Sequence, residues 1–105
     1  MTVEFSTENF QANVLAAQVP VLVDFYTATC GPCQRLVGVI DELASDNEGK
    51  AIVGKVDAYE NSELSLKYTV NAVPTILLFK NGEVVERHVG FKNKKELQKL
   101  IETHS

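Results

Sequence analysis

The stretch Val21-Leu22-Val23-Asp24-Phe25-Tyr26-Thr27-Ala28-Thr29-Cys30-Gly31-Pro32-Cys33 decides the fold. Its first six residues are a short, nearly continuous apolar run, which is typical of a β-strand buried on both faces. From Cys33 to about Ser45 the apolar residues recur at helical spacing instead. The two cysteines therefore lie where a buried strand passes into a helix.

The position of the two cysteines points to redox chemistry. Unpaired N–H groups and the helix dipole lower the pKa of a thiol at a helix N-terminus. The thiolate is the nucleophile in thiol–disulfide exchange. A spacing of three residues brings the sulfurs of Cys30 and Cys33 within bonding reach, and Pro32 suits a first helical turn because it donates no N–H. We expect Cys30 to be the more exposed, attacking thiol and Cys33 the resolving thiol, one turn deeper.

Two other roles for the cysteine pair are weaker. A structural zinc site needs four ligands, and the sequence adds only His88 and His104, both expected on the surface far along the chain. A pair of inert, buried cysteines is the second alternative. Against it, Cys-x-x-Cys beside alternating strands and helices is a redox signal. We therefore expect neither a metal nor a bound cofactor.

Asp24 interrupts an otherwise apolar strand six residues before Cys30. An ionised carboxylate is costly to bury, so burial would raise its pKa. This favours a role as proton acceptor for Cys33, through water, with Lys55 tuning the carboxyl group. Two simpler interpretations stay open: Asp24 points to solvent at a sheet end, or it merely pairs with Lys55 on the neighbouring strand.

The rest of the chain alternates strands and helices in the order β-α-β-α-β-α-β-β-α, which indicates one α/β domain over residues 1–105 with a central mixed sheet. An Asn-Gly pair at residues 81–82 predicts a tight hairpin, and residues 93 and 96 have the spacing of a capping box. The expected strands are Val3–Phe5, Val21–Tyr26, Ala51–Asp57, Thr75–Phe79 and Val84–Val89. The expected helices are Ser6–Ala17, Cys33–Ser45, Glu60–Tyr68 and Asn93–Thr103.

Composition and charge exclude several functional classes. The 105 residues carry 10 Lys and Arg against 14 Asp and Glu, a net charge of −4, which argues against a nucleic-acid partner. No apolar run approaches the ~18 residues of a membrane span. The chain opens without the basic and apolar segments of a signal peptide, and two cysteines are too few for a disulfide-stapled secreted protein. We expect a cytoplasmic protein that acts as a monomer, away from membranes.

Three stretches resemble the thioredoxin family: Val23 to Cys33 (VDFYTATCGPC), Val73 to Gly82 (VPTILLFKNG), and Val89-Gly90. The similarity runs from about Val3 to Ile101. It implies a three-layer α/β/α fold around a central mixed five-stranded sheet. It also implies a protein-disulfide reductase whose partners are a thioredoxin reductase and disulfide-containing client proteins.

The resemblance also assigns roles to individual residues. Cys30 matches the nucleophile and Cys33 the resolving cysteine. Asp24 matches the family's buried acid and Lys55 its lysine neighbour. Pro74 matches a cis-proline that faces the disulfide, although most X-Pro bonds are trans and the local sequence alone does not predict a cis bond. The implied client-binding groove consists of Thr29, Gly31, Pro32, Ala72, Val73, Pro74 and Gly90, with Phe91 at its border.

Four positions depart from the family pattern. Thr29 stands where a tryptophan usually precedes the first cysteine, and Tyr26 where a second is common; the chain has no tryptophan. Gln34 replaces a common lysine or arginine, and Gly38 replaces a proline that kinks the helix. Thr29 and Gln34 favour a rival function, a binding module of the same fold with incidental redox activity.

Overall fold

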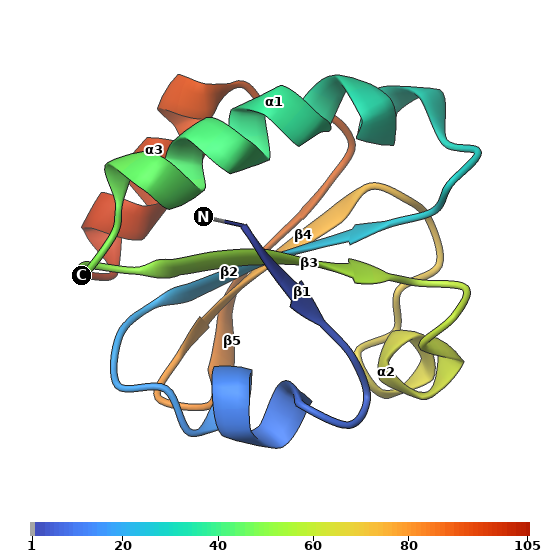
Figure 1. The fold of residues 1–105 in the computed structure, drawn as a ribbon, viewed down its shortest axis with the longest axis horizontal. Helices are drawn as coiled ribbons and strands as arrows, with labels where there is room; N and C mark the ends of the chain where they lie inside the picture. Colours follow the sequence, from blue (N-terminus) through green and yellow to red (C-terminus); the bar gives the residue numbers. More distant parts are fainter. Residues whose placement is uncertain (1) are drawn as a thin grey trace.

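Five strands form one mixed sheet in the computed structural model, which describes residues 2–105 (Figure 1). Counted across the sheet, the first three strands run parallel to one another. The fourth strand is antiparallel to both of its neighbours, the third and the fifth. The predicted mixed five-stranded sheet is confirmed, and every strand end lies within one residue of its expected place. In spatial order the strands are β1 (Val3–Phe5), β3 (Ile52–Asp57), β2 (Val21–Tyr26), β4 (Thr75–Lys80) and β5 (Glu83–Val89).

The central position of β2 explains its apolar sequence. This strand lies between β3 and β4, and its residues 21–25 are all buried. A strand covered by helices on both faces needs apolar side chains on both. The hairpin between β4 and β5 also forms as predicted, because Asn81 and Gly82 both adopt positive φ angles, 54° and 80°.

Helices cover both faces of the sheet, so the expected three-layer α/β/α arrangement is confirmed (Figure 1). On one face lie α1 (Gly31–Asp46) and α3 (Lys94–Thr103). On the other lie α2 (Ser62–Lys67) and η1 (Gln11–Leu15), a single turn of π-helix. Each pair of helices packs over its own apolar core, so the sheet separates two clusters of buried side chains.

The predicted helix Ser6–Ala17 is wrong in its extent, since η1 is all that forms there. Before η1 the chain makes a turn in which Ser6 and Asn9 exchange hydrogen bonds. The Ser6 N–H donates to Asn9 Oδ1 (2.9 Å), and the Asn9 N–H donates to Ser6 Oγ (3.3 Å). Short polar side chains of this kind compete with helical backbone bonds. Phe10 is nevertheless buried, as the apolar spacing predicted.

The other helices differ from expectation only at their ends. α1 begins at Gly31, two residues before Cys33. α2 is shorter than the predicted Glu60–Tyr68, because Asp57 Oδ1 accepts the N–H groups of residues 59 and 60 (3.0 and 3.1 Å) and holds them in a turn. The predicted capping box of α3 is present. Within residues 2–105, no helix has the length and apolar character that a membrane crossing requires.

Candidate active site

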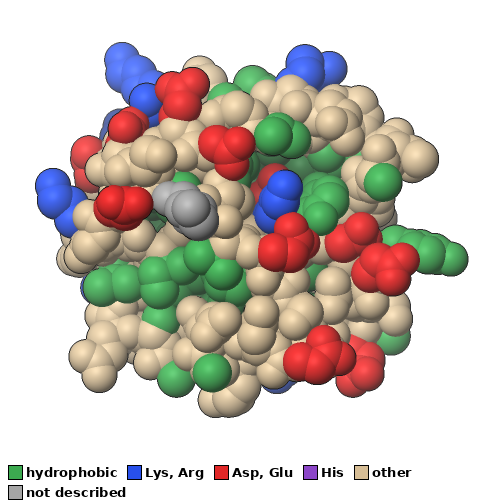
Figure 2. Space-filling model, in the orientation of Figure 1, with side chains coloured by type: hydrophobic (Ala, Val, Ile, Leu, Met, Phe, Trp, Pro, Cys, Tyr) green, Lys and Arg blue, Asp and Glu red, His purple; other side chains and the backbone are tan. Residues whose placement is uncertain are grey.

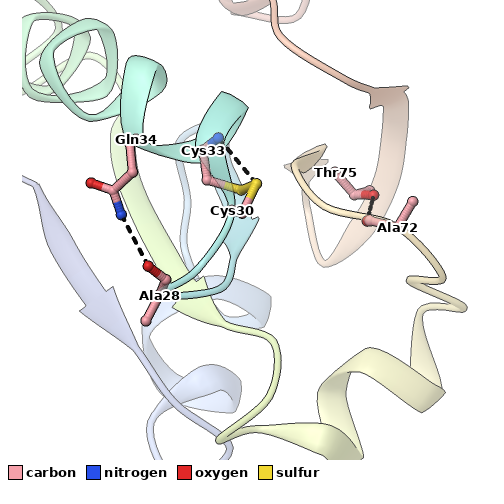
Figure 3. The surroundings of a disulfide bond; sticks show 6 residues. All are labelled: Ala28, Cys30, Cys33, Gln34, Ala72 and Thr75. Atoms are coloured by element: carbon pink, nitrogen blue, oxygen red, sulfur yellow. Dashed lines mark hydrogen bonds between the residues drawn. A yellow bond between two sulfur atoms is a disulfide. The ribbon is translucent and has the colours of Figure 1, made fainter.

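Cys30 and Cys33 form a disulfide where β2 passes into α1 (Figure 3). Cys30 is the N-cap residue of α1, and its Sγ accepts a hydrogen bond from the Cys33 N–H (3.1 Å). Cys33 is only 2% exposed, whereas Cys30 is half-buried and has exposed neighbours on both sides. The structure therefore has the expected contrast between an accessible first cysteine and a buried second one.

The local sequence holds the first sulfur at the helix terminus. The Cys30 N–H donates to the Thr27 carbonyl oxygen (3.4 Å), which closes a turn after β2. Pro32 lies in the first turn of α1, where an N–H would have no partner within the helix. The free N–H groups and the helix dipole favour a negative charge at this place, so they stabilise the Cys30 thiolate in the reduced protein.

A loop with a cis Val73–Pro74 peptide bond lies across from the disulfide (Figure 3). The Thr75 hydroxyl donates to the Ala72 carbonyl oxygen (2.6 Å), and the Gly90 N–H donates to the Pro74 carbonyl oxygen (2.8 Å). These bonds fix the loop. The pairing of Thr75 with Phe25 on β2 and with Val89 on β5 places the start of β4 and the end of β5 at the same end of the sheet as the cysteines. The family resemblance implied the cis bond, whereas local sequence reasoning missed it.

Several of the expected groove positions are exposed next to the disulfide in the chain. Thr29, Gly31 and Pro32 are all exposed beside it. Phe91 is 42% exposed, and the Arg35 guanidinium lies 5.7 Å from its ring centroid. Thr29 and Gly31 therefore flank Cys30 directly along the chain, and the Phe91 ring contacts a side chain of α1.

Asp24 is buried on β2, on the sheet face that α1 covers. The residue is 3% exposed, and its Oδ1 has no hydrogen-bond partner among the described residues. Asp24 lies opposite Lys55 on β3, and Lys55 lies opposite Glu4 on β1, so the three side chains share one face. Burial raises the pKa of Asp24 to about 7; the Lys55 ammonium opposes this rise and Glu4 adds to it. The alternative in which Asp24 points to solvent is wrong.

A cavity of about 140 Å³ connects the Asp24 carboxyl group with Cys33. Its volume admits several water molecules, at ~30 Å³ each, and its polar groups offer them partners. A water-mediated path for a proton between the two side chains is thus geometrically available. The cavity is lined by Asp24, Tyr26, Cys33, Gln34, Val37, Ile40, Asp41 and Lys55.

Sequence reasoning missed Glu4, which lies beside the buried acid. The Tyr26 hydroxyl donates to Glu4 Oε2 (3.0 Å), and Lys55 Nζ lies 5.3 Å from the Tyr26 ring centroid. Burial, together with this hydrogen bond, raises the pKa of Tyr26. The alternation in Val3–Phe5 places Glu4 on the face opposite its apolar neighbours. Its pairing partner on β3 is a long-range contact that local sequence does not reveal.

The two histidines lie away from the cysteines. His104 and His88 each contact one carboxylate oxygen of Glu86 through Nε2, at 2.8 and 3.1 Å, and these hydrogen bonds lower the pKa of Glu86. Both rings are half-buried, whereas the sequence led us to expect them on the surface. Residues 2–105 contain no group of His, Cys, Asp and Glu side chains arranged to hold a metal ion.

Disulfide exchange requires one thiol that a partner can reach and a second thiol close enough to displace that partner. Cys30 and Cys33 meet both conditions, and α1 supplies the field that activates the first. Fold and site together define a thiol–disulfide oxidoreductase.

Comparison with known proteins narrows this class. The sequence profile of the Thioredoxin family matches residues 1–103. Thioredoxin 2 of Chlorobaculum tepidum is 43% identical over 101 residues, which cover 96% of this chain and 93% of that protein. The thioredoxin of Staphylococcus saprophyticus is 40% identical over 102 residues, covering 97% and 96%. The chain belongs to the thioredoxin family, and its protein-disulfide reductase activity uses the Cys30/Cys33 pair.

Proposed function

We propose that the chain is a dithiol electron carrier that reduces disulfides in client proteins and is itself reduced again by a thioredoxin reductase. It acts as a single domain over residues 1–105, as a monomer, in the cytoplasm. One observation carries the proposal: Cys30 is accessible, whereas Cys33 is 2% exposed and lines the same cavity as Asp24. A large client therefore meets the first sulfur only.

In the first step, the Cys30 thiolate attacks one sulfur of the client's disulfide. The client S–S bond breaks as a bond between Cys30 and the client forms, and the displaced client sulfur leaves as a thiolate that takes a proton from water. An extended client segment lies along the backbone of Val73 by strand addition. The groove that receives it consists of Thr29, Gly31, Pro32, Ala72, Val73, Pro74 and Gly90.

In the second step, Cys33 loses its proton to Asp24 through water in the cavity. The Cys33 thiolate then attacks Cys30 Sγ, so the Cys30–Cys33 bond forms, the mixed disulfide breaks, and the second client sulfur leaves as a thiolate. The client has gained two electrons and the chain has lost two. Lys55, which faces the Asp24 carboxyl group across the strands, tunes its affinity for the proton.

Two cysteine variants test this order of attack. Cys30→Ser abolishes reduction of insulin disulfides, because the accessible nucleophile is gone. Cys33→Ser still attacks but does not resolve, so it accumulates a covalent complex with the client. Insulin turbidity measures the first effect, and mass spectrometry of the complex the second. Unchanged turnover by Cys30→Ser would overturn the proposal.

A binding module of the same fold is the second candidate, favoured by the small Thr29 beside the attacking cysteine. The reduction potential of the Cys30/Cys33 pair, combined with turnover by a thioredoxin reductase, separates the candidates. A low potential with fast turnover supports the carrier. A low potential without turnover supports the binding module, and a much higher potential indicates an oxidant instead.

A further inference from the structure

A hollow of about 280 Å³ opens beside the attacking cysteine. One wall is the segment 27–29, which leads from β2 into Cys30, and the other is formed by Asp57, Tyr59 and Glu60 after β3. The Ala58 N–H donates to the Tyr26 carbonyl oxygen (2.8 Å), which ties the two walls together at the carboxyl ends of neighbouring parallel strands. The hollow therefore begins one residue from Cys30 and adjoins the proposed groove.

Tyr59 supplies a flat apolar surface to this hollow. The residue is 81% exposed, and its ring makes no aromatic, cation–π or hydroxyl contact among residues 2–105. On the opposite wall, Thr29 is small and exposed, so it leaves the space in front of the ring open. A solvent-exposed aromatic ring beside a reactive sulfur offers a contact surface to a side chain of a binding partner.

The hollow is also acidic. Asp57 is held in place by the N–H groups of Tyr59 and Glu60, which donate to its Oδ1 at 3.0 and 3.1 Å. Within the described part of the chain, neither Asp57 nor Glu60 pairs with a lysine, arginine or histidine. Figure 2 shows acidic side chains gathered on this side of the molecule, near the end of β3 in Figure 1. Two carboxylates that have no cationic partner among residues 2–105, beside an exposed aromatic ring, are suited to binding a positively charged side chain.

We propose that this hollow binds an arginine or lysine side chain of the client, next to the cysteine that Cys30 attacks. The cation lies over the Tyr59 ring and faces the Asp57 and Glu60 carboxylates. Arginine fits better than lysine, because its planar guanidinium stacks on an aromatic face and binds carboxylates through two N–H groups. This inference rests on the proposed function, and it names a feature of the clients that the chain selects.

The test compares three disulfide-bonded peptides that differ only in the residue next to the cysteine: arginine, glutamine or glutamate. The reduced protein attacks the arginine peptide about three- to ten-fold faster than the glutamine peptide, and the glutamate peptide more slowly still. The ratio falls toward one in 1 M salt, where the screening length is only about 3 Å. Stopped-flow rates of the first attack, measured with Cys33→Ser, give the ratio without the resolving step.

Three variants locate the effect. Glu60→Gln removes a charge, Tyr59→Ala removes the ring, and Thr29→Trp fills the hollow; each lowers the arginine-to-glutamine ratio at least two-fold. Glu83→Gln is the matched control, since it removes an exposed acidic charge at the start of β5 and leaves the ratio unchanged.

The outcomes separate this inference from the proposed function. Equal rates for the arginine and glutamine peptides, with ordinary reduction of both, overturn the inference and leave the reductase intact. Reduction of none of the three peptides overturns the reductase function and the inference with it. A preference for arginine that survives in all three hollow variants shows that the cation binds elsewhere, and it also overturns the inference.

Discussion

Asp24 is a buried ionisable residue beside the cavity that Cys33 also lines. One oxygen of its carboxyl group has no hydrogen-bond partner among residues 2–105, and the ionised form of the group is costly to keep away from water. Because burial raises its pKa to about 7, the group releases and accepts protons near neutral pH, where a general base is most effective. Asp24 lines the same cavity as Cys33, which is why we propose it as the proton acceptor of the second step.

Replacement of Asp24 by Asn tests its role at the residue scale. In the unchanged protein, resolution of the mixed disulfide accelerates as pH rises through about 7, because the carboxylate form is the acceptor. In Asp24→Asn this acceleration disappears, and resolution at pH 7 slows by about ten-fold or more, within the range of general-base effects. The first attack by Cys30 changes much less. Stopped-flow measurement of both steps from pH 5.5 to 9 checks this, and equal slowing of the two steps contradicts it.

Sequence alone predicted the candidate reactive residues but not their surroundings. The cysteine spacing and the charged residue within an apolar strand are local patterns, so Cys30, Cys33 and Asp24 were identifiable from the residues themselves. The place of Glu4 beside Lys55, and the cavity next to Asp24, depend on contacts between residues about fifty positions apart in the chain, which local sequence patterns do not reveal. The cis bond before Pro74 followed from the family resemblance, since nothing in Val73-Pro74 itself favours it.

At the scale of elements, the edge strand β1 approaches β3 so closely that residue 54 must be glycine. A β-carbon at Gly54 would overlap the Phe5 ring and the Val3 carbonyl oxygen. In α1, by contrast, a β-carbon at Gly38 would meet nothing within 4 Å. The same substitution therefore has opposite expected effects at these two glycines.

Gly54→Ala lowers the free energy of unfolding by about 1–3 kcal/mol, the cost of forcing an extra carbon into a packed core. Gly38→Ala raises it by about 0.5–1 kcal/mol, because alanine loses less conformational freedom in a helix. Urea denaturation of the oxidised forms measures both. A Gly54→Ala protein as stable as the unchanged chain would show that β1 does not pack as described.

The N-terminus of α3 offers a second test. Asn93 Oδ1 accepts the Glu96 N–H (2.8 Å), and Glu96 Oε1 accepts the Asn93 N–H (3.1 Å). Asn93→Ala removes the first bond and leaves the Glu96 N–H without its acceptor, whereas the backbone N–H of residue 93 can still donate to Glu96, so stability falls by about 1 kcal/mol. Asn93→Ser, which retains a capping oxygen, loses much less. Circular dichroism measures the thermal unfolding of both variants and shows which one loses more stability. Equal losses in the two variants contradict the prediction.

Elements with strong local signals were predictable, and those held by tertiary contacts were not. The strands follow from apolar runs, and α3 from its capping residues and periodic leucines. The segment before β2 carries apolar residues at helical spacing, yet its polar side chains bond to one another, and the Thr7 N–H donates to Asn61 Oδ1 (2.9 Å) beside α2. That long-range contact replaces the first turns of the predicted helix.

At the scale of the whole molecule, Asp24 links the reactive site to global stability. Its pKa is about 7 in the folded protein, against 3.8 for the ordinary carboxyl group. Between these two values the folded state holds a proton that the unfolded state has released. Stability from this group is therefore fully present below about pH 4 and is lost as pH rises through 7. The loss amounts to about 4 kcal/mol, since one pKa unit corresponds to ~1.4 kcal/mol.

Asp24→Asn removes this pH-dependent contribution to the free energy of unfolding, because an amide does not ionise. Relative to the unchanged chain, the variant is similar in stability near pH 4 and gains up to about 4 kcal/mol by pH 8. Glu86, whose lowered pKa acts at acidic pH, is present in both proteins, so its effect cancels in the difference. Urea unfolding of the oxidised forms from pH 4 to 8.5 measures that difference, with exposed Glu83→Gln as a control for loss of a surface charge. A difference constant with pH would mean that Asp24 keeps one protonation state throughout, and its part in the second step would fall with it.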